Sequence, residues 1–162
     1  HNYILLIIHY NKAEVKKKMI KKFYITGTRR GLGKALEAEY GNCDNLEDCD
    51  IFINCKHDGF EQVDLLYKAA TAGKRIINIG SNSGDGNKPW PHKYAIEKAA
   101  LDKANEQLYY QGVHTTVIRF GYFDSPRVSN IDAKKMSIDY CIGVIKWVIE
   151  QDHRVKDLTV CP

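Results

Sequence analysis

The octet Thr26-Gly27-Thr28-Arg29-Arg30-Gly31-Leu32-Gly33 sets the architecture of this chain, because it joins a predicted strand to a predicted helix. Phe23–Ile25 before it is a short β-prone run, and residues 32–40 after it have helical character. Glycines at such a junction allow a tight turn, a close backbone approach to a phosphate, and close packing of helix on strand. The free N–H groups at the helix start favour negative charge. The octet therefore predicts a phosphate-binding turn.

Strands and helices alternate along the rest of the chain. Short β-prone segments predict further strands at 51–53, 75–79, 113–120 and 157–160, and the segments between them predict helices at 60–72, 92–111 and 138–151. This order indicates βαβ units, and hence an α/β fold with a doubly wound parallel sheet: a Rossmann-like, three-layer arrangement with helices on both faces. No repeat or linker divides residues 19–162, which we expect to form a single domain.

Residues 1–18 fit this pattern less well. Their apolar run at 3–8 is β-prone, but it precedes Met19, which looks like a natural initiator ahead of the first strand. We expect residues 1–18 to be an N-terminal extension or an added edge strand, and the sequence leaves both possibilities open.

Composition excludes several classes of protein. The 162 residues are 44% hydrophobic and 27% charged, which excludes a disordered chain. The longest apolar run, residues 4–8, falls far short of the roughly 18–20 residues that a membrane span needs. No basic segment precedes that run, as one would in a secretory signal. We therefore expect a cytoplasmic protein with no membrane partner.

The cysteines and histidines predict neither a disulfide framework nor a metal site. An odd number of cysteines without a CxxC pair is typical of ordinary thiols in a reducing compartment. Three of the cysteines lie near His57, but their spacing matches no zinc site, and the chain has no HExxH motif. We predict no metal. The five cysteines are Cys43, Cys49, Cys55, Cys141 and Cys161.

Basic residues gather near the start of the chain, whose formal net charge is +4. Such a cluster can bind nucleic acid. However, no aromatic residue interleaves with the lysines at 16–18, and no nucleic-acid-binding module is readable nearby. We prefer a solvated lysine-rich turn, with a nucleic-acid-binding module as the least favoured alternative, and expect no nucleic-acid partner.

A second group of residues points to acid/base chemistry. Tyr94 and Lys98 are four residues apart on a predicted helix, so they share one face. A lysine cation close to a phenol stabilises the phenolate, which suits a general acid/base. Ser81 follows the predicted strand at 75–79, and ligands of α/β sheets bind at the carboxyl ends of parallel strands. The alternative for the tyrosine–lysine spacing alone is a solvated helix face.

Taken together, these motifs resemble the short-chain dehydrogenase/reductase family. Thr26-Gly-x-x-x-Gly-x-Gly33, Ile77-Asn-Ile-Gly-Ser81, Tyr94-x-x-x-Lys98 and Phe120-Gly-Tyr-Phe-Asp-Ser-Pro126 occur in the order of that family. The segment at 157–162 is similar to its final strand, so the resemblance covers about residues 20–162. It implies an NAD(P)-dependent oxidoreductase that transfers hydride between a nicotinamide and a carbonyl or alcohol carbon.

The resemblance also implies roles for individual residues. Tyr94 would be the acid/base, Ser81 would hydrogen-bond the substrate oxygen, and Lys98 would bind the nicotinamide ribose while tuning Tyr94. The cofactor-binding residues would be Gly27, Thr28, Arg29, Arg30, Gly31, Leu32, Gly33, Asn54, Tyr94, Lys98, Gly121, Phe123 and Ser125.

Two arginines bear on the choice of cofactor. Arg30 falls where NADP-preferring members often carry arginine, and Arg29 adds a second cation. Guanidinium groups suit a 2′-phosphate, so we expect NADP(H) in preference to NAD(H). For the enzyme that the resemblance implies, we expect the reductase direction. The alternative is an exposed basic turn.

The chain also departs from the family pattern. Residues 34–50 are too few for the two strands and the helix that family members place there, so we interpret 51–54 as the family's fourth strand and the second and third as missing. Those two strands form half of the adenine pocket. An alternative register makes 51–54 the second strand and Asp58 the acidic residue that contacts the adenosine ribose.

Further departures concern the catalytic side. The helix before residue 74 is short, and the family's fourth catalytic residue, an asparagine that helps hold a proton-relay water, has no clear counterpart; Asn54 and Asn78 are not in its place. Phe120 replaces a proline, and the substrate-covering segment after Pro126 is short, which predicts an open site.

These losses support a second hypothesis, a reduced, non-catalytic relative that binds a nucleotide or a protein. Against it, Ser81, Tyr94 and Lys98 are all present at working spacing, so we prefer the enzyme. Loss of the outer strands exposes the edge of the first strand, which residues 3–8 of this chain or of a neighbour would cover. We expect a homo-oligomer, a dimer or tetramer, because so small a sheet gains stability from burying its faces and edges. The resemblance implies that it would form through the helix at 92–111 and the helix before it.

Overall fold

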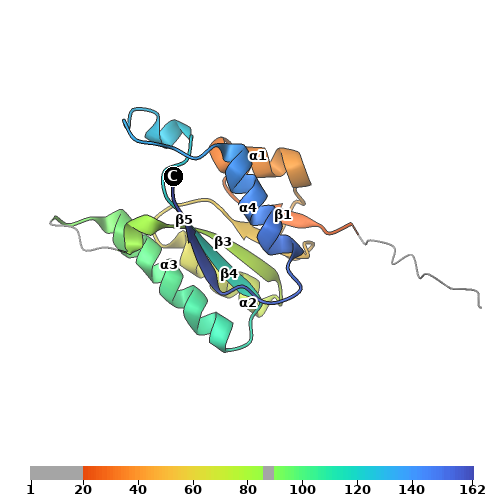
Figure 1. The fold of residues 1–162 in the computed structure, drawn as a ribbon. Coiled ribbons are helices and arrows are strands. Elements are labelled where there is room, and N and C mark those ends of the chain that lie inside the picture. The colour runs from red at the N-terminus through yellow and green to blue at the C-terminus, as the bar shows by residue number, and fades with distance from the viewer. Residues whose placement is uncertain (1–19, 86–89) are drawn as a thin grey trace, which may run out of the picture.

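Five parallel strands form one sheet in the order β1-β2-β3-β4-β5 in the computed structural model, which describes residues 20–85 and 90–162 (Figure 1). The strands are β1 (Phe23–Ile25), β2 (Ile51–Asn54), β3 (Arg75–Ser81), β4 (Thr115–Phe120) and β5 (Asp157–Val160). The helices are α1 (Gly31–Tyr40), α2 (Glu61–Thr71), α3 (Lys93–Tyr110) and α4 (Ile138–Glu150), with short 3-10 turns η1 (Asn82–Gly84) and η2 (Pro126–Val128). The predicted elements are confirmed, with bounds close to those observed.

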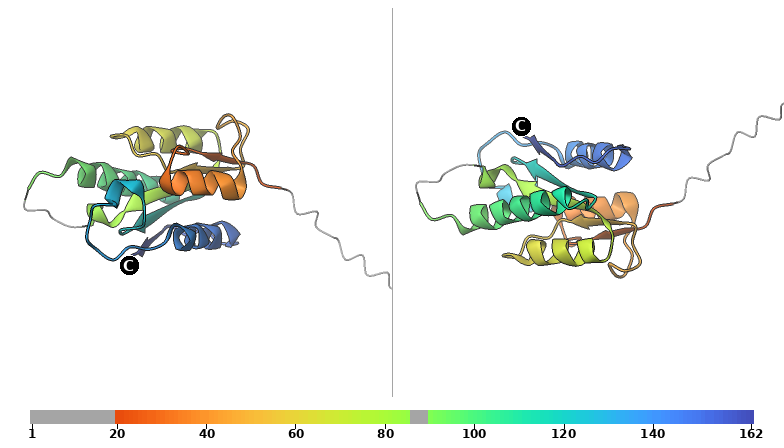
Figure 2. Two further views of the ribbon diagram at one scale, coloured as in Figure 1. Left: turned by 90° about the horizontal axis from the view of Figure 1, so that it is seen from above. Right: turned by 90° about the horizontal axis from the view of Figure 1, so that it is seen from below.

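Helices cover both faces of the sheet, as the two apolar cores show. One core joins the side chains on one face of the sheet to α1 and α4, with Leu36 and Ile145 fully buried. The other joins the opposite strand face to α2 and α3, with Leu66 and Leu101 fully buried. Figure 1 shows the sheet between these two helix pairs, and Figure 2 views the domain from the side of α1 and α4 and from the side of α2 and α3. The predicted three-layer, Rossmann-like fold is therefore confirmed.

The position of β2 decides between the two registers proposed for residues 51–54. β2 lies between β1 and β3, with Ile51 opposite Phe23 on one side and opposite Arg75 on the other. A second strand of the family would lie outside β1, at the edge of the sheet. The fourth-strand interpretation is therefore confirmed and the alternative register is wrong. Asp58 follows the inner strand β2 and is not at the outer edge.

The handedness of the crossover through α1 is explained by the missing strands. The connections through α1, α2 and α3 all move one strand in the same direction, yet α1 lies on the opposite face from the other two. The connection through α1 therefore has the opposite hand, although about 98% of such crossovers share one hand. Two further strands outside β1 would reverse its direction and restore the common hand. The connection through α4 shares the exception without this explanation.

A loop takes the place of the missing neighbour of β1. The side chain of Asn42 accepts a hydrogen bond from Ile25 N–H at 2.8 Å and donates one to Ile25 C=O at 3.2 Å. Cys43 N–H donates to Phe23 C=O at 2.8 Å. The edge that the sequence predicted to be exposed is thus occupied by residues 42–43. The predicted extension at 1–18 and its run at 3–8 lie outside the described residues.

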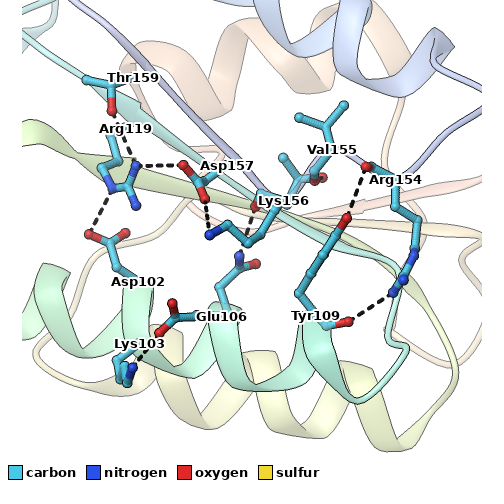
Figure 3. A network of polar contacts seen from close by, with 12 residues as sticks. Asp102, Lys103, Glu106, Tyr109, Arg119, Arg154, Val155, Lys156, Asp157 and Thr159 are labelled. Atoms are coloured by element: carbon cyan, nitrogen blue, oxygen red, sulfur yellow. Dashed lines mark hydrogen bonds and ion pairs between the residues drawn. The ribbon is translucent and has the colours of Figure 1, made fainter.

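Charged and polar pairs hold α3 against the strands beyond it (Figure 3). Arg119 on β4 reaches Asp102 of α3 at 3.1 Å and Asp157 of β5 at 3.2 Å. Further along α3, Tyr109 C=O accepts a hydrogen bond from the guanidinium of Arg154 at 2.9 Å. These contacts hold α3, whose first turns carry the candidate catalytic residues, in place on the sheet.

No helix in the described part of the chain is long and apolar enough to cross a membrane.

Candidate active site

The predicted site residues gather at the carboxyl edge of the sheet. The octet follows β1, Asn54 ends β2, Ser81 ends β3, and Gly121 follows β4. Parallel register brings these ends together, with Asn54 opposite Asn78 and Ser81 opposite Phe120. Because all the strands point the same way, their ends line one side of the domain, where α/β folds bind ligands.

The turn between β1 and α1 has the geometry that its glycines predict. Gly27 has φ +78°, a left-handed conformation that glycine adopts without strain. A Cβ on Gly33 would lie 2.1 Å from Gly27 C=O, so only glycine lets the helix start so close to the turn. Thr26 Oγ1 accepts hydrogen bonds from Cys55 and Lys56 N–H, at 3.0 and 3.1 Å. The turn is thereby fixed to the end of β2.

Lys98 is buried beneath this edge of the sheet and makes two direct hydrogen bonds. Its Nζ donates to Gln62 Oε1 at 2.7 Å and to Ile79 C=O at 2.9 Å, and its side chain is 3% exposed. Burial lowers the pKa of Lys98 to about 8. An ammonium carries three N–H donors, so one remains for a further acceptor.

Tyr94 lies half-buried one helical turn before Lys98. The Lys98 Nζ atom is 5.6 Å from the centroid of the Tyr94 ring. The ring of His57 packs edge-on against the Tyr94 ring at a centroid distance of 4.7 Å. The ring of His92 is tilted to the Tyr94 ring, with a centroid distance of 6.1 Å. The predicted tyrosine and lysine are therefore brought together, and two imidazoles flank the phenol.

Ser81 is the third candidate catalytic residue and lies at the end of β3. Its Oγ accepts a hydrogen bond from Ser83 N–H at 3.1 Å, which caps the short turn η1. A Cβ on Gly84 would lie 3.1 Å from Ala99 N, so η1 packs directly on the backbone of α3. Ser81 is thus held beside the helix of Tyr94, and its hydroxyl proton is not used in the cap.

Gln62 is a residue that the sequence analysis missed. It lies on α2, is 2% exposed, and bonds Lys98 through Oε1 while its Nε2 donates to Asn54 C=O at 2.8 Å. The resemblance implied an asparagine on this helix and none was found. The sequence shows only that a glutamine occupies the second position of this helix. Its side chain reaches Lys98 because α2 starts close to the end of β2.

Asn54 is placed below the site. It is fully buried, and its Nδ2 donates to Gln62 C=O at 2.8 Å and to Asn78 Oδ1 at 3.0 Å. Asn78 in turn donates to Asn105 Oδ1 at 3.2 Å and to Thr115 Oγ1 at 3.1 Å. This buried amide network holds β2, β3 and α3 in register beneath Lys98.

His57 and Glu97 form a second pair that was missed. His57 Nε2 is 3.0 Å from Glu97 Oε2, and the carboxylate is 6% exposed. Lys93 Nζ lies 3.5 Å from Glu97 Oε1. Burial and the neighbouring Lys98 cation lower the pKa of His57, while Glu97 raises it. Residues 57 and 97 are far apart in the sequence, so no local signal pointed to this pair.

The segment after β4 contributes the remaining predicted residues. Gly121 N–H donates to Val160 C=O at 2.8 Å, which pairs this segment with the end of β5. Phe123 packs on Phe120 at a centroid distance of 6.0 Å and so belongs to the core side of the loop. The Cβ of Ser125 lies 3.7 Å from the Cβ position of Gly31, which places η2 over the start of α1.

Arg29 and Arg30 are both exposed on the turn. Leu32, in the first turn of α1, is buried in the core. A cavity of about 510 Å³ lies along the outer edge of β1, and its lining includes Gly27 and Thr28 of the turn but neither arginine. Among residues 20–85 and 90–162, no group of side chains could hold a metal ion.

Comparisons with known proteins identify the fold. No protein-family model and no curated protein matches the sequence. Solved structures do match. A short-chain dehydrogenase from Burkholderia cenocepacia in complex with NADP has a TM-score of 0.65 at 16% identity, over 87% of this chain and 89% of that chain.

Two further structures give the same result. An alcohol dehydrogenase from the archaeon Thermococcus sibiricus, complexed with 5-hydroxy-NADP, has a TM-score of 0.67 at 16% identity, over 86% of this chain and 95% of that chain. A 4-hydroxyisoleucine dehydrogenase complexed with NADH has a TM-score of 0.64 at 16% identity, over 87% of this chain and 96% of that chain. The chain therefore has the fold of short-chain dehydrogenases, here reduced to five strands.

Proposed function

We propose that the chain is a shortened member of the short-chain dehydrogenase/reductase family and an NAD(P)-dependent oxidoreductase, acting as a reductase on a small carbonyl substrate. The observation that carries this proposal is the contact of Tyr94 with the buried Lys98 at the carboxyl edge of the sheet. The octet, with its helix start, lies at the same edge.

The residues present fit a nicotinamide dinucleotide. The turn at Gly27 and the first N–H groups of α1 suit its pyrophosphate, and the one remaining N–H of Lys98 suits a ribose hydroxyl. Ser125, over the start of α1, is a further donor near the phosphates. When bound, the nicotinamide supplies the hydride that reduces the carbonyl carbon.

The protein's own side chains would supply the proton to the substrate carbonyl oxygen and hydrogen-bond that oxygen. Tyr94 donates its phenolic proton to the carbonyl oxygen as the carbon is reduced, and the ammonium of Lys98 stabilises the resulting phenolate. Ser81 donates its hydroxyl proton in a hydrogen bond to the same oxygen. The proton is available because Ser83 N–H uses only a lone pair of Ser81 Oγ. His57 and His92 limit where the phenol ring can move.

The finer expectations remain predictions. The preference for NADP(H) over NAD(H) rests on Arg29 and Arg30 alone. A dimer or tetramer would form through the outer faces of α2 and α3, where Tyr67, Ile96 and Tyr110 are exposed, and light scattering of the purified chain tests it. A cytoplasmic location likewise stays a prediction.

Two experiments test the function. Calorimetric titration with NADPH and with NADH asks whether the reduced fold binds a dinucleotide. Oxidation of the bound cofactor, followed by absorbance with a panel of aldehydes and ketones, then asks whether it turns over. Tyr94→Phe is expected to bind cofactor as the wild type does and to lose at least about 100-fold in rate. Dinucleotide binding without turnover by any carbonyl would favour the non-catalytic alternative.

A further inference from the structure

Two basic side chains of different chemistry lie beside the ring of Tyr94. Lys98 supplies a positive charge, with its Nζ atom 5.6 Å from the ring centroid. His57 supplies an imidazole, with its centroid 4.7 Å from that of the phenol. The proposed reaction uses the charge of the lysine and gives the imidazole a steric role only. A histidine in this place can gain and lose a proton between about pH 5 and 8, so its charge also bears on the phenol.

The hydrogen bond to Glu97 sets the state of the His57 imidazole. Nε2 of the ring lies 3.0 Å from Oε2 of the carboxylate. Because a carboxylate oxygen accepts hydrogen bonds, the proton of the neutral ring is on Nε2. Nδ1 is buried and has no hydrogen-bond partner among the residues that the structure describes. The ring is therefore held through Nε2, and it gains its second proton at Nδ1.

The charged groups around His57 keep it neutral at pH 7. Burial lowers the pKa of His57 below its ordinary value of 6.5, the cations of Lys98 and Arg127 lower it further, and Glu97 raises it. These groups come from α3 and η2, and its own loop adds Lys56 and Asp58, which pair with each other at 3.4 Å. His57 therefore takes up its proton on the acid side of neutral pH.

The net charge beside the phenol changes when His57 titrates. The carboxylate of Glu97 is 6% exposed, so water screens it weakly, whereas Lys93, 3.5 Å from its other oxygen, is 82% exposed. With a neutral imidazole, the pair of His57 and Glu97 carries one negative charge; with a protonated imidazole, it carries none. A negative charge opposes the formation of a phenolate close by, and a positive charge favours it. Protonation of His57 therefore makes Tyr94 a stronger acid.

Resting on the proposed function, we propose that His57 and Glu97 form a positioning pair that tunes Tyr94 through charge, so that reduction is faster when His57 is protonated. Glu97 orients the imidazole, and the imidazole carries the titrating charge to the phenol. The proton that reaches the carbonyl oxygen still comes from Tyr94, and the hydride from the bound nicotinamide. The pair thus adds no step to the reaction and makes its rate depend on pH.

NMR of the full chain without cofactor or substrate tests the coupling of the two rings. Ring-carbon signals of labelled tyrosine, assigned to Tyr94 by their loss in Tyr94→Phe, are followed together with the imidazole protons of His57. We expect a component of the Tyr94 shift to have the midpoint of the His57 titration. This component should be absent in His57→Asn and move to lower pH in Glu97→Gln.

Two further histidine variants locate the effect. His92→Asn removes the other imidazole beside the phenol and should leave the component at the His57 midpoint in place. His153→Asn, an exposed change before β5, is the matched surface control and should do the same. If His57→Asn does not fold, Glu97→Gln decides the test, because it keeps the imidazole and an acceptor for Nε2.

The pH profile of reduction gives the second readout. At saturating cofactor and substrate, we expect kcat to rise at least about threefold as the pH falls through the His57 midpoint. The rise should be absent in His57→Asn, and in Glu97→Gln it should move to lower pH by the same amount as the NMR midpoint. A purely structural role of His57 would instead lower kcat at every pH and leave the shape of the profile unchanged.

The outcomes separate this inference from the proposed function. Tyr94 signals that do not follow the His57 titration would overturn the inference and leave the oxidoreductase standing. A rise in kcat that persists in His57→Asn, or that keeps its midpoint in Glu97→Gln, would do the same. Coupled titrations in a chain that turns over no carbonyl would overturn the proposed function, and the effect on its rate with it.

Discussion

The ammonium of Lys98 donates a hydrogen bond to Gln62 Oε1 over 2.7 Å, and this contact joins α3 to α2 beneath the candidate site. A second bond to Ile79 C=O fixes the same Nζ atom to β3. The lysine is therefore held by protein groups on two sides, in a place that excludes water. One donor is left over, which is the arrangement needed to hold a ribose hydroxyl while facing Tyr94.

Replacing Gln62 tests how much this contact stabilises the fold. Gln62→Leu removes an acceptor from a buried cation, and a hydrogen bond to a charged group is worth about 1.5–3 kcal/mol. We expect the free energy of unfolding to fall by that amount in chemical denaturation. Gln111→Leu, an exposed change at the end of α3, is the control. Equal stability of Gln62→Leu and the wild type would contradict the assigned contact.

The buried lysine also predicts a dependence of stability on pH. Burial lowers the pKa of Lys98 from 10.5 to about 8. Between these values the unfolded chain holds the proton more tightly than the folded chain, so folding stability rises with pH across this window. The stability of the wild type relative to Lys98→Met should therefore rise from about pH 8 to about pH 10.5, because other titrating groups cancel in the difference. A difference that does not vary with pH would count against a buried, protonated lysine.

The pair of His57 and Glu97 is open to direct titration. The carboxylate raises the pKa of the imidazole against the lowering effect of burial and Lys98. Glu97→Gln should therefore lower the pKa of His57 further, as followed by NMR of the imidazole protons. Glu106→Gln on the same helix should leave it unchanged. A rise in the pKa of His57 on removing Glu97 would refute the pairing.

The covered edge of β1 predicts a change in association. Asn42→Ala leaves the N–H and C=O of Ile25 without their side-chain partner, and an open strand edge is a template for pairing with another chain. We expect a loss of about 1–2 kcal/mol in stability, together with larger species in light scattering. Asn45→Ala removes two hydrogen bonds to Asp48 in the same loop but leaves the edge of β1 covered, so it should keep the wild-type size in light scattering. The absence of both effects would mean that the amide of Asn42 does not protect the edge.

The repeating elements were predictable because each carries a local signal. The bounds of β1 and β5 match the strands predicted at 23–25 and 157–160, and α2 ends at Thr71, one residue before the predicted end at 72. The inner place of β2 also followed from the sequence, because residues 34–50 are too few to hold two further strands and a helix. Periodicity and motif order are properties of neighbouring residues, so one sequence contains them.

The long-range partners were not predictable. Gln62 meets Lys98 across 36 positions, and His57 meets Glu97 across 40, through the packing of α2 and the β2 end on α3. The cover of β1 depends on a single amide, Asn42, which has no signature apart from its position after a helix. Such contacts depend on side-chain reach in three dimensions. They appear only when the helices are placed on the sheet.

The central claim, that this reduced sheet still holds a nicotinamide dinucleotide, is tested most directly by calorimetric titration of the full chain with NADH and with NADPH. The account predicts saturable binding with a Kd below about 100 µM, which corresponds to roughly −5.5 kcal/mol or better. The heats should be fitted by a single site. No binding of either dinucleotide would contradict the account, and Ser81, Tyr94 and Lys98 would then be parts of a scaffold without a cofactor.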